Sequence, residues 1–277
     1  MLYVVATPIG NLEDISLRAL RILREADVIF AEDTRHTRHL LTHFDIHTPL
    51  RSCHEHNERQ STESILALLR EGKQIALVSD AGLPGISDPG GLIIQQVAEE
   101  RLPHTVIPGA NAALTALLLS GLPTDHFCFE GFLPRDKRER KKRLAALQNE
   151  TRTLLFYESP LRVADTLDEL HRTWGERPAA LCRELTKIHE TVLRGSLSEL
   201  CNRIDSPLKG ECVLVIGGAE PAPIETADPE ELLSAMHVLI ETDGLRAKDA
   251  AKQLAGDGIS ANALYRMYLN QKSPQQR

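Results

Sequence analysis

Apolar and polar residues alternate along the chain in two patterns, and together they predict an α/β protein. Short apolar runs rich in β-branched residues predict strands that are buried on both faces, as in a parallel sheet. In the first half such runs cover residues 2–7, 27–31, 74–79 and 105–107. Between them, apolar residues at three- and four-residue spacing predict helices at residues 12–25, 34–44, 61–71 and 90–100. A helix at 114–120 is expected to close this first unit, an α/β domain of residues 1–120.

The second half repeats the alternation and predicts a second α/β domain at residues 121–222. Its expected strands are 127–132, 153–157, 179–183 and 211–216, and its expected helices are 137–147, 163–173 and 198–204. Gly121-Leu-Pro-Thr-Asp125 is interpreted as a hinge between the halves, because glycine and proline interrupt a helical pattern. Pro221-Ala-Pro223 predicts a stiff linker. Residues 223–277 then form a small appendage of three helices, at 229–242, 245–254 and 261–269.

Composition narrows the class of protein. The chain has 277 residues, of which 42% are hydrophobic, but no apolar run approaches the ~18–20 residues that cross a bilayer. The five cysteines are odd in number and form no Cys-x-x-Cys pair, which argues against a disulfide framework or a zinc ribbon and indicates a cytoplasmic protein. A net charge of −7 excludes a uniformly basic protein that coats nucleic acid, and no DNA partner is expected.

The segments that follow the strands are the candidate binding loops, because ligands of a parallel α/β sheet bind beyond the carboxyl ends of its strands. These loops are residues 6–11, 31–35, 79–85 and 108–112, and they are rich in small, polar or backbone-exposing residues. Asp80 is the sharpest candidate, since its carboxylate either caps the following turn or accepts hydrogen bonds from a ligand. Asp88-Pro89 is expected to be the N-cap and first-turn proline of the next helix.

Two common nucleotide-binding motifs are absent. No Gly-x-Gly-x-x-Gly follows a strand, so a Rossmann dinucleotide or Rossmann methyltransferase site is disfavoured. Gly85 and Gly90 have the spacing of a P-loop, but Gly91 stands where that motif requires lysine, so hydrolysis of a nucleoside triphosphate is disfavoured too.

Seven motifs occur in a recognisable order. They are Ala6-Thr-Pro-Ile-Gly-Asn-Leu12, Ala31-Glu-Asp-Thr-Arg-His-Thr37, Ser79-Asp-Ala-Gly-Leu-Pro-Gly-Ile-Ser-Asp-Pro-Gly90, Pro108-Gly-Ala-Asn-Ala-Ala113, Phe156-Tyr-Glu-Ser-Pro160, Arg183-Glu-Leu-Thr-Lys187 and Lys209-Gly-Glu-Cys-Val213. Across residues 2–218 the sequence resembles the tetrapyrrole (corrin/porphyrin) methylase superfamily. The Glu-Asp-Thr-Arg segment resembles the members that methylate ribosomal RNA and separates the chain from the precorrin enzymes.

This resemblance implies a fold, a cofactor and a reaction. The fold is two α/β domains with S-adenosylmethionine in the cleft between them, usually in a homodimer. The implied reaction is methyl transfer to the ribose 2′-hydroxyl of a cytidine in the decoding region of small-subunit (16S) ribosomal RNA, as free RNA or in the assembled small subunit. Carried over by motif, the expected cofactor contacts are Pro8, Asp80, Gly82, Leu83, Asn111, Ala112, Tyr157 and Cys212. The expected substrate side comprises Glu32-Asp-Thr-Arg35, His54-Glu-His-Asn57 and Glu184-Leu-Thr-Lys187.

A ribose hydroxyl is a poor nucleophile while protonated, so a base or a cation beside it should speed the transfer by ~10²–10⁴-fold. Lys187 is a candidate cation, or a base if desolvation lowers its pKa. Lys187 and Glu184 are the first catalytic candidates, with Glu32 and Asp33 as alternatives. The same strand-end cluster also fits a purely structural ion pair.

The remaining polar clusters are interpreted as RNA contacts. His36, His39 and His43 share a helical face, but transfer from a sulfonium needs no Lewis acid and no cysteine completes a tetrahedral set, so no metal is expected. Residues 135–143 hold seven basic and two acidic residues; such a run is usually a solvated face, but with an RNA substrate it favours phosphate contact. The candidate RNA-binding residues are Arg35, His54, Asn57, Arg138, Lys141 and Lys142.

Two other functions fit parts of the pattern. A precorrin or porphyrinoid methyltransferase would use the same cofactor cleft but leaves the basic run and Glu-Asp-Thr-Arg without a role. A non-catalytic RNA-binding adaptor would act through the basic helix and the tail, whose residues 247–265 have the cadence of a helix-turn-helix, and it predicts no cofactor binding.

Overall fold

The first five strands form one parallel sheet in the order β3-β2-β4-β1-β5. The computed structural model describes residues 1–204, 208–220, 229–242, 244–255 and 259–272. The strands of this sheet are β1 (Leu2–Val5), β2 (Val28–Ala31), β3 (Leu50–Ser52), β4 (Ile75–Val78) and β5 (His104–Ile107). The parallel sheet predicted for the first half is confirmed, but β3 was not predicted. Its three residues are too few to give a hydrophobic period, and it lies at the edge of the sheet.

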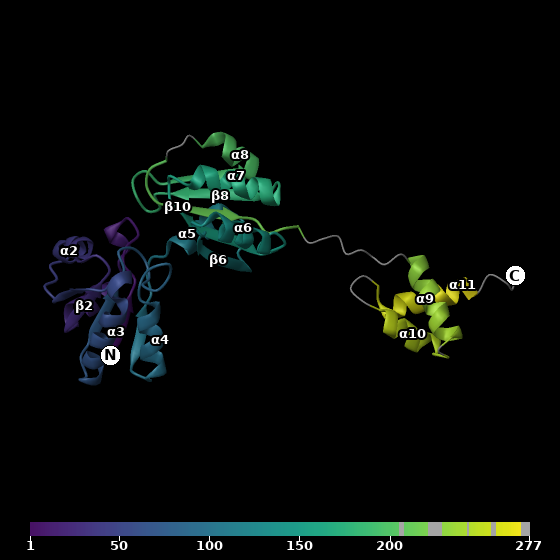
Figure 1. The fold of residues 1–277 in the computed structure, drawn as a ribbon, viewed down its shortest axis with the longest axis horizontal. Helices are drawn as coiled ribbons and strands as arrows, with labels where there is room; N and C mark the ends of the chain where they lie inside the picture. Colours follow the sequence, from purple (N-terminus) through teal and green to yellow (C-terminus); the bar gives the residue numbers. More distant parts are fainter. Residues whose placement is uncertain (205–207, 221–228, 243, 256–258, 273–277) are drawn as a thin grey trace. The chain divides into compact units, whose positions relative to one another are not determined.

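Helices cover both faces of this sheet, because successive side chains of a strand point to opposite sides. Leu2 and Val4 join the core that lies under α3 (Glu58–Arg70) and α4 (Gly91–Glu99), which run side by side in Figure 1. Val5 joins the opposite core, under α1 (Leu17–Glu25) and α2 (Thr34–His43).

Two helix starts differ from the predictions. The segment 12–25 is not one helix, because a 3₁₀ helix (Leu12–Asp14) comes first and the Ser16 hydroxyl then accepts the Ala19 N–H to start α1. Asp88 is not the N-cap of α4. That position is held by Gly90 at φ 126°, whose N–H donates to Glu58 at 2.8 Å. A second 3₁₀ helix, Glu55–Asn57, precedes α3.

The second sheet has the order β6-β7-β10-β8-β9 and is mixed. Only β6 and β7 are parallel, and the other three pairs are antiparallel. The α/β fold class is thus confirmed, with a sheet of different type in each half. Strand β9 was not predicted; it pairs only with β8 at the sheet edge, and its residues are half-buried or exposed. The strands are β6 (Phe127–Phe132), β7 (Thr153–Glu158), β8 (Pro178–Arg183), β9 (Thr191–Ser196) and β10 (Cys212–Ile216).

The helices of the second sheet come from both halves of the sequence. One face is covered by α6 (Lys137–Ala146), α7 (Val163–Trp174) and α8 (Leu197–Arg203), whose apolar side chains form a core with Phe156 and Leu214. The other face is covered by α5 (Ala112–Ser120), which was expected to close the first unit. This helix is apolar on all sides, and Ala116 and Leu117 pack against Val213 and Val215. The loop from β5 to α5 therefore leads directly from one sheet to the other.

Three helices form a separate small core. The chain divides into two compact units, Met1–Ala219 and Glu220–Arg277, and both sheets belong to the first. The second holds α9 (Pro229–Glu241), α10 (Ala247–Leu254) and α11 (Ala261–Lys272), which pack around Met236, Ala251 and Leu264. The predicted linker Pro221-Ala-Pro223 lies outside the described residues. The division into residues 1–120, 121–222 and 223–277 stays a prediction.

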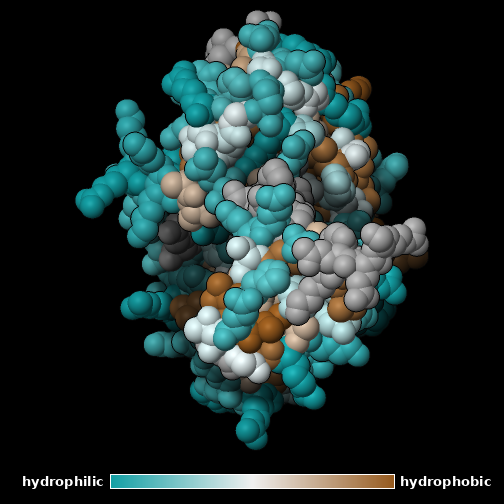
Figure 2. Space-filling view, turned by 90° about the vertical axis from the view of Figure 1, so that its right-hand side faces the viewer, coloured by the Kyte–Doolittle hydropathy of each residue, from teal (hydrophilic) through white to brown (hydrophobic). Residues whose placement is uncertain are grey.

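No described helix is both long and apolar enough to cross a membrane. The face of the molecule in Figure 2 is mostly hydrophilic, with hydrophobic residues gathered in small groups between polar ones.

Candidate functional site

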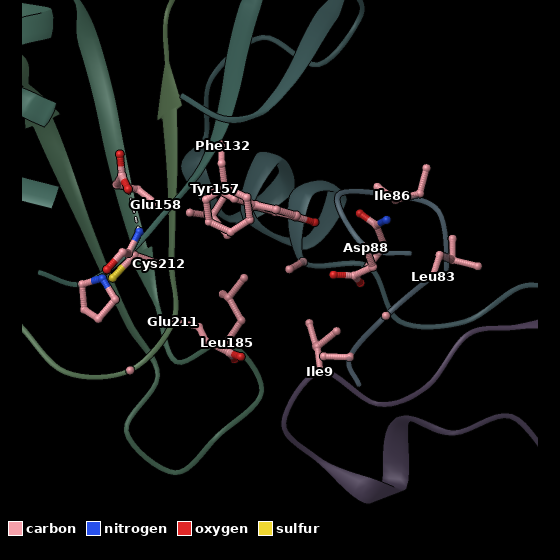
Figure 3. A pocket seen from close by; sticks show the side chains of 18 residues that line it. Ile9, Leu83, Ile86, Asp88, Phe132, Tyr157, Glu158, Leu185, Glu211 and Cys212 are labelled. Atoms are coloured by element: carbon pink, nitrogen blue, oxygen red, sulfur yellow. Dashed lines mark hydrogen bonds between the residues drawn. The ribbon is translucent and has the colours of Figure 1, made fainter. Parts of the chain in front are cut away.

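A cavity of about 350 Å³ lies within the first unit and is lined by loops of both sheets (Figure 3). Ile9 and Leu83 come from loops that follow strands of the first sheet, and Tyr157 and Cys212 belong to strands of the second. Most of the wall is apolar. The complete lining is Ile9, Ala81, Gly82, Leu83, Ile86, Asp88, Asn111, Ala112, Phe132, Tyr157, Glu158, Ser159, Pro160, Leu185, Gly210, Glu211, Cys212 and Val213.

Two loops of the first sheet are fastened together where they meet the cavity. The Thr7 N–H donates to the Gly82 carbonyl at 2.9 Å, and the Gly82 N–H donates back to Thr7 at 3.1 Å. Gly82 has φ 79°, a backbone conformation that residues with a Cβ rarely adopt. The candidate binding loop 108–112 also lies here, because a Cβ on Gly82 would be 3.7 Å from the Ala110 carbonyl.

Asp88 is a cavity carboxyl group with a strongly raised pKa. Burial raises the pKa of its carboxyl from the ordinary 3.8 to about 6, and the negative charge of Glu32 adds to the rise. Sequence reasoning assigned this residue to a helix cap. The missed signal was its place in the loop after β4, three residues beyond the selected binding loop 79–85 and inside the motif of residues 79–90.

The cavity mouth carries aromatic and apolar side chains from both sheets. Phe132, at the end of β6, is 55% exposed and meets Tyr157 edge-on with 5.7 Å between ring centroids. Ile86, from the loop after β4, is 42% exposed. Burial raises the pKa of the Tyr157 phenol, which therefore stays protonated at neutral pH. An exposed apolar patch at the edge of a cavity is a common feature of a ligand-binding site.

Six of the eight expected cofactor contacts line the cavity, and two do not. The six are Gly82, Leu83, Asn111, Ala112, Tyr157 and Cys212. Pro8 and Asp80 instead line a neighbouring recess. The Asp80 carboxylate accepts the Asp33 N–H at 3.0 Å, so it joins the loops after β2 and β4.

Lys187 and Glu184 form an ion pair beside the cavity. The Lys187 Nζ donates to Glu184 at 2.8 Å and to the cavity residue Glu211 at 3.1 Å. Burial lowers the pKa of Lys187, but the two carboxylates outweigh it and the net shift is upward. The hydrogen bond from Lys187 lowers the pKa of Glu184. Both groups stay charged at neutral pH, so Lys187 has the properties of a fixed cation and not of a base.

The loop that holds Lys187 is strained and packs on the first sheet's loop. Glu184 and Thr186 have φ values of 53° and 66°, which are rare for residues with a Cβ. A Cβ on Gly10 would lie 2.5 Å from Lys187 Cγ and 2.9 Å from the Leu185 carbonyl. Only glycine therefore lets this loop approach so closely, and the approach fixes Lys187 between the two sheets.

The two alternative bases differ in their surroundings. Asp33 caps α2 and binds Arg35 through two hydrogen bonds of 2.7 and 3.1 Å, which hold its pKa far below the ordinary range. Glu32 is half-buried, and burial together with the charge of Asp80 raises its pKa. Of these two carboxyl groups, Glu32 is the one whose proton affinity is shifted toward neutral pH.

The expected RNA contacts fall into two groups. Asn57 is committed to the backbone, since its side chain accepts the His54 N–H at 2.8 Å; the His54 residue itself is exposed. Arg138, Lys141 and Lys142 are exposed on α6.

The basic side chains of residues 135–143 do not all face solvent as free cations. Arg143 binds Glu130 at 2.6 Å. Arg140 is buried and donates to Glu169 at 2.5 Å and to Thr166 at 2.8 Å. Two of the seven cations thus serve the fold.

Comparison with known proteins identifies this architecture. The sequence model of the tetrapyrrole (corrin/porphyrin) methylases matches residues 1–201. The chain belongs to the tetrapyrrole methylase family. This methylase is 48% identical to the ribosomal RNA small subunit methyltransferase I of Halalkalibacterium halodurans, over 96% of its own length and 94% of that protein's. It is 44% identical to the protein of the same name from Escherichia coli O157:H7, over 98% and 95%.

Solved structures of the family show the same fold. Uroporphyrin-III-C-methyltransferase from Thermus thermophilus aligns with a TM-score of 0.56 at 23% identity, over 78% of this methylase and 93% of that chain. The cobalt precorrin-4 methyltransferase aligns with a TM-score of 0.57 at 18% identity, over 78% and 94%. The resemblance inferred from the seven motifs is thus confirmed for both family and fold.

Proposed function

We propose that this methylase transfers a methyl group from S-adenosylmethionine to the ribose 2′-hydroxyl of a cytidine in the decoding region of small-subunit (16S) ribosomal RNA. The observation that carries the proposal is the identity of 41–49% to proteins named ribosomal RNA small subunit methyltransferase I, nearly full-length in most of them. The solved enzymes named for uroporphyrin and precorrin substrates share only 18–23% of their residues with this chain. A cytoplasmic location follows from this substrate.

The chemistry of the cavity fits the cofactor. When bound, S-adenosylmethionine supplies an activated methyl group on a positively charged sulfonium and carries an ammonium as well. The apolar wall suits its adenosine, and the acidic side chains of Asp88 and Glu211 suit its positive charges. Glu158 also lines the cavity, but its carboxylate is occupied by Thr166 at 2.8 Å and Ser159 at 2.8 Å. We therefore assign cofactor binding to Gly82, Leu83, Asp88, Asn111, Ala112, Tyr157, Glu211 and Cys212.

Lys187 and two carboxyl groups have different roles in activating the ribose hydroxyl. Lys187, held charged by Glu184 and Glu211, stabilises the negative charge that develops on the ribose oxygen. Asp88 and Glu32 have raised pKa values and are the groups suited to accept the hydroxyl proton. Arg138, Lys141 and Lys142 hold the phosphate backbone on α6.

The test uses tritium-labelled S-adenosylmethionine and the full-length protein. Undermethylated small subunits, free 16S RNA and a porphyrinoid are offered in parallel, and the RNA is digested to nucleosides to locate the label. Label in 2′-O-methylcytidine supports the proposal, and label on a base or only on the porphyrinoid contradicts it. Isothermal titration with S-adenosylmethionine separates an enzyme from an RNA-binding adaptor, because the adaptor binds no cofactor.

We also propose a homodimer. Leu114 and Leu118 are 48% and 75% exposed on α5, whose opposite face is buried on the second sheet. A second copy of the chain would remove these side chains from water, and ~25 cal/mol is gained per Å² of apolar surface covered. Leu118→Lys is expected to yield monomers in light scattering with gel filtration, whereas Leu161→Lys, another exposed leucine, should not. A dimeric Leu118→Lys protein would place the interface elsewhere.

A further inference from the structure

A recess of about 430 Å³ lies next to the cavity, on the other side of the loops that meet at Thr7 and Gly82. Thr7 and Pro8 line the recess, while Ile9 lines the cavity. In the second loop, Asp80 lines the recess and Gly82 lines the cavity. The recess and the cavity therefore share a wall, and the pair of hydrogen bonds between Thr7 and Gly82 lies in it.

The outer side of the recess is formed by α2. This helix carries two arginines and three histidines and contains no acidic residue, in a protein whose net charge is −7. His36, His39 and His43 line the recess. His39 and His43 also line an adjoining shallow hollow, together with Arg35 and Arg38. The recess and the hollow therefore adjoin at His39 and His43.

The two arginines of that hollow are not equivalent. Arg35 is occupied by its two hydrogen bonds to Asp33. Arg38 is exposed, and among the described residues it forms no ion pair. Arg38 is therefore the cation available to an anionic ligand, and none of the expected RNA contacts included it.

We infer that the recess binds a nucleotide of the substrate RNA next to the methylated one, with its base in the recess and its phosphate at Arg38; this rests on the proposed function. The recess offers a base the apolar surfaces of Pro8 and Leu40 and the flat rings of the histidines. The Asp80 carboxylate offers an acceptor to an exocyclic amino group. A neighbouring nucleotide must lie close to the cavity, and the shared wall satisfies that requirement.

A shared metal ion does not explain the three histidines. His36 and His43 are seven residues apart on one helix, so their Cα atoms are separated by ~10 Å along its axis. Helical metal sites pair histidines four residues apart, and of these three only His39 and His43 have that spacing. Within the part of the chain that the structure describes, no cluster of three or more metal-ligating residues was found.

The experiment compares two variants of the full-length protein with two matched controls. Arg38→Ala removes the phosphate contact and His39→Ala removes a wall of the recess. Arg18→Ala removes an exposed arginine of α1, and His47→Ala removes an exposed histidine beyond the end of α2; neither lines the recess or the hollow. Binding of a fluorescein-labelled single-stranded RNA from the decoding region is measured by anisotropy at several salt concentrations, and affinity for S-adenosylmethionine by calorimetry.

Arg38→Ala is expected to weaken RNA binding about three- to tenfold and to reduce the slope of log affinity against log salt by about one. His39→Ala is expected to weaken RNA binding with little change of slope, and neither variant should alter cofactor affinity. RNA binding by Arg38→Ala equal to that of Arg18→Ala would overturn the inference. Because binding is read without catalysis, a wild-type protein that binds RNA but methylates none would refute the proposed function and still decide this site.

Discussion

The raised pKa of Asp88 implies that this carboxylate destabilises the empty enzyme. At neutral pH the group is ionised inside an apolar cavity, with Glu32 contributing a like charge. We therefore predict that Asp88→Asn, which keeps the shape of the side chain and removes the charge, makes the protein more stable. The pKa shift from 3.8 to about 6 corresponds to at most about 3 kcal/mol at ~1.36 kcal/mol per unit, and because the group is partly open to solvent, screening reduces the expected gain to roughly 1–2 kcal/mol.

The stability difference between Asp88→Asn and the wild type should grow as the pH rises. Below pH ~4 the carboxyl is protonated in both the folded and the unfolded chain, so the variant has no advantage. Between pH 4 and pH 6 the unfolded chain releases this proton while the folded chain retains it, so wild-type stability falls relative to Asp88→Asn. Above pH 6 the difference is constant. Relative to Asp88→Asn, the wild type therefore loses the most stability above pH 6, which includes neutral pH.

The assay is urea unfolding at pH 4.5, 6 and 7.5. The single tryptophan, Trp174, is a native probe because it is only 9% exposed and packs on Phe156. Asp14→Asn, at an exposed carboxylate, is the matched control and should change stability by less than ~0.5 kcal/mol at each pH. An Asp88→Asn protein that is less stable than wild type at pH 7.5, or whose advantage does not grow with pH, would refute the reasoning. The same variant should bind S-adenosylmethionine about tenfold more weakly, or ~1.4 kcal/mol.

Three further variants test the division of roles. Lys141→Glu with Lys142→Glu should weaken small-subunit binding and reduce its salt slope by about two, measured by filter binding; an unchanged slope would leave α6 as a solvated face. Arg140→Met should leave that slope unchanged but lower the free energy of unfolding by about 2 kcal/mol, because it removes a buried guanidinium that donates to Glu169 and Thr166. Lys187→Met should lower kcat about 10²-fold with unchanged cofactor affinity in single-turnover assays, and wild-type turnover would make the ion pair structural.

Local sequence patterns were sufficient for most of the fold. Strand β4 is a continuous apolar run because it is buried within a single sheet. Helix α7 has apolar residues at helical spacing because one of its faces packs on a single sheet. The errors arise where a segment packs on, or pairs with, a part of the chain that is distant in sequence. Helix α5 follows a strand of the first sheet but packs on the second, and β9 is a half-exposed edge strand that only its pairing with β8 reveals.

The residues of the candidate site likewise divide into those that local sequence could predict and those that it could not. Gly82 and Asn111 were predictable, because the carboxyl ends of parallel strands meet at one rim. Glu211 and Phe132 were not, since they reach the cavity through the mixed pairing of the second sheet, which no local pattern specifies. The ionisation of Lys187 also depends on Glu211, which is 24 residues away in sequence.

The paired peptides of Thr7 and Gly82 have a consequence for how ligands arrive. Each residue belongs to a loop that borders two spaces, so a displacement that improves the fit on one side alters the geometry on the other. By thermodynamic reciprocity, any effect of the donor molecule on the affinity for the nucleic acid strand is matched by an equal effect of the strand on the affinity for the donor molecule. A substitution that moves the Thr7 and Gly82 peptides to raise the affinity for one of these ligands therefore also changes the site of the other.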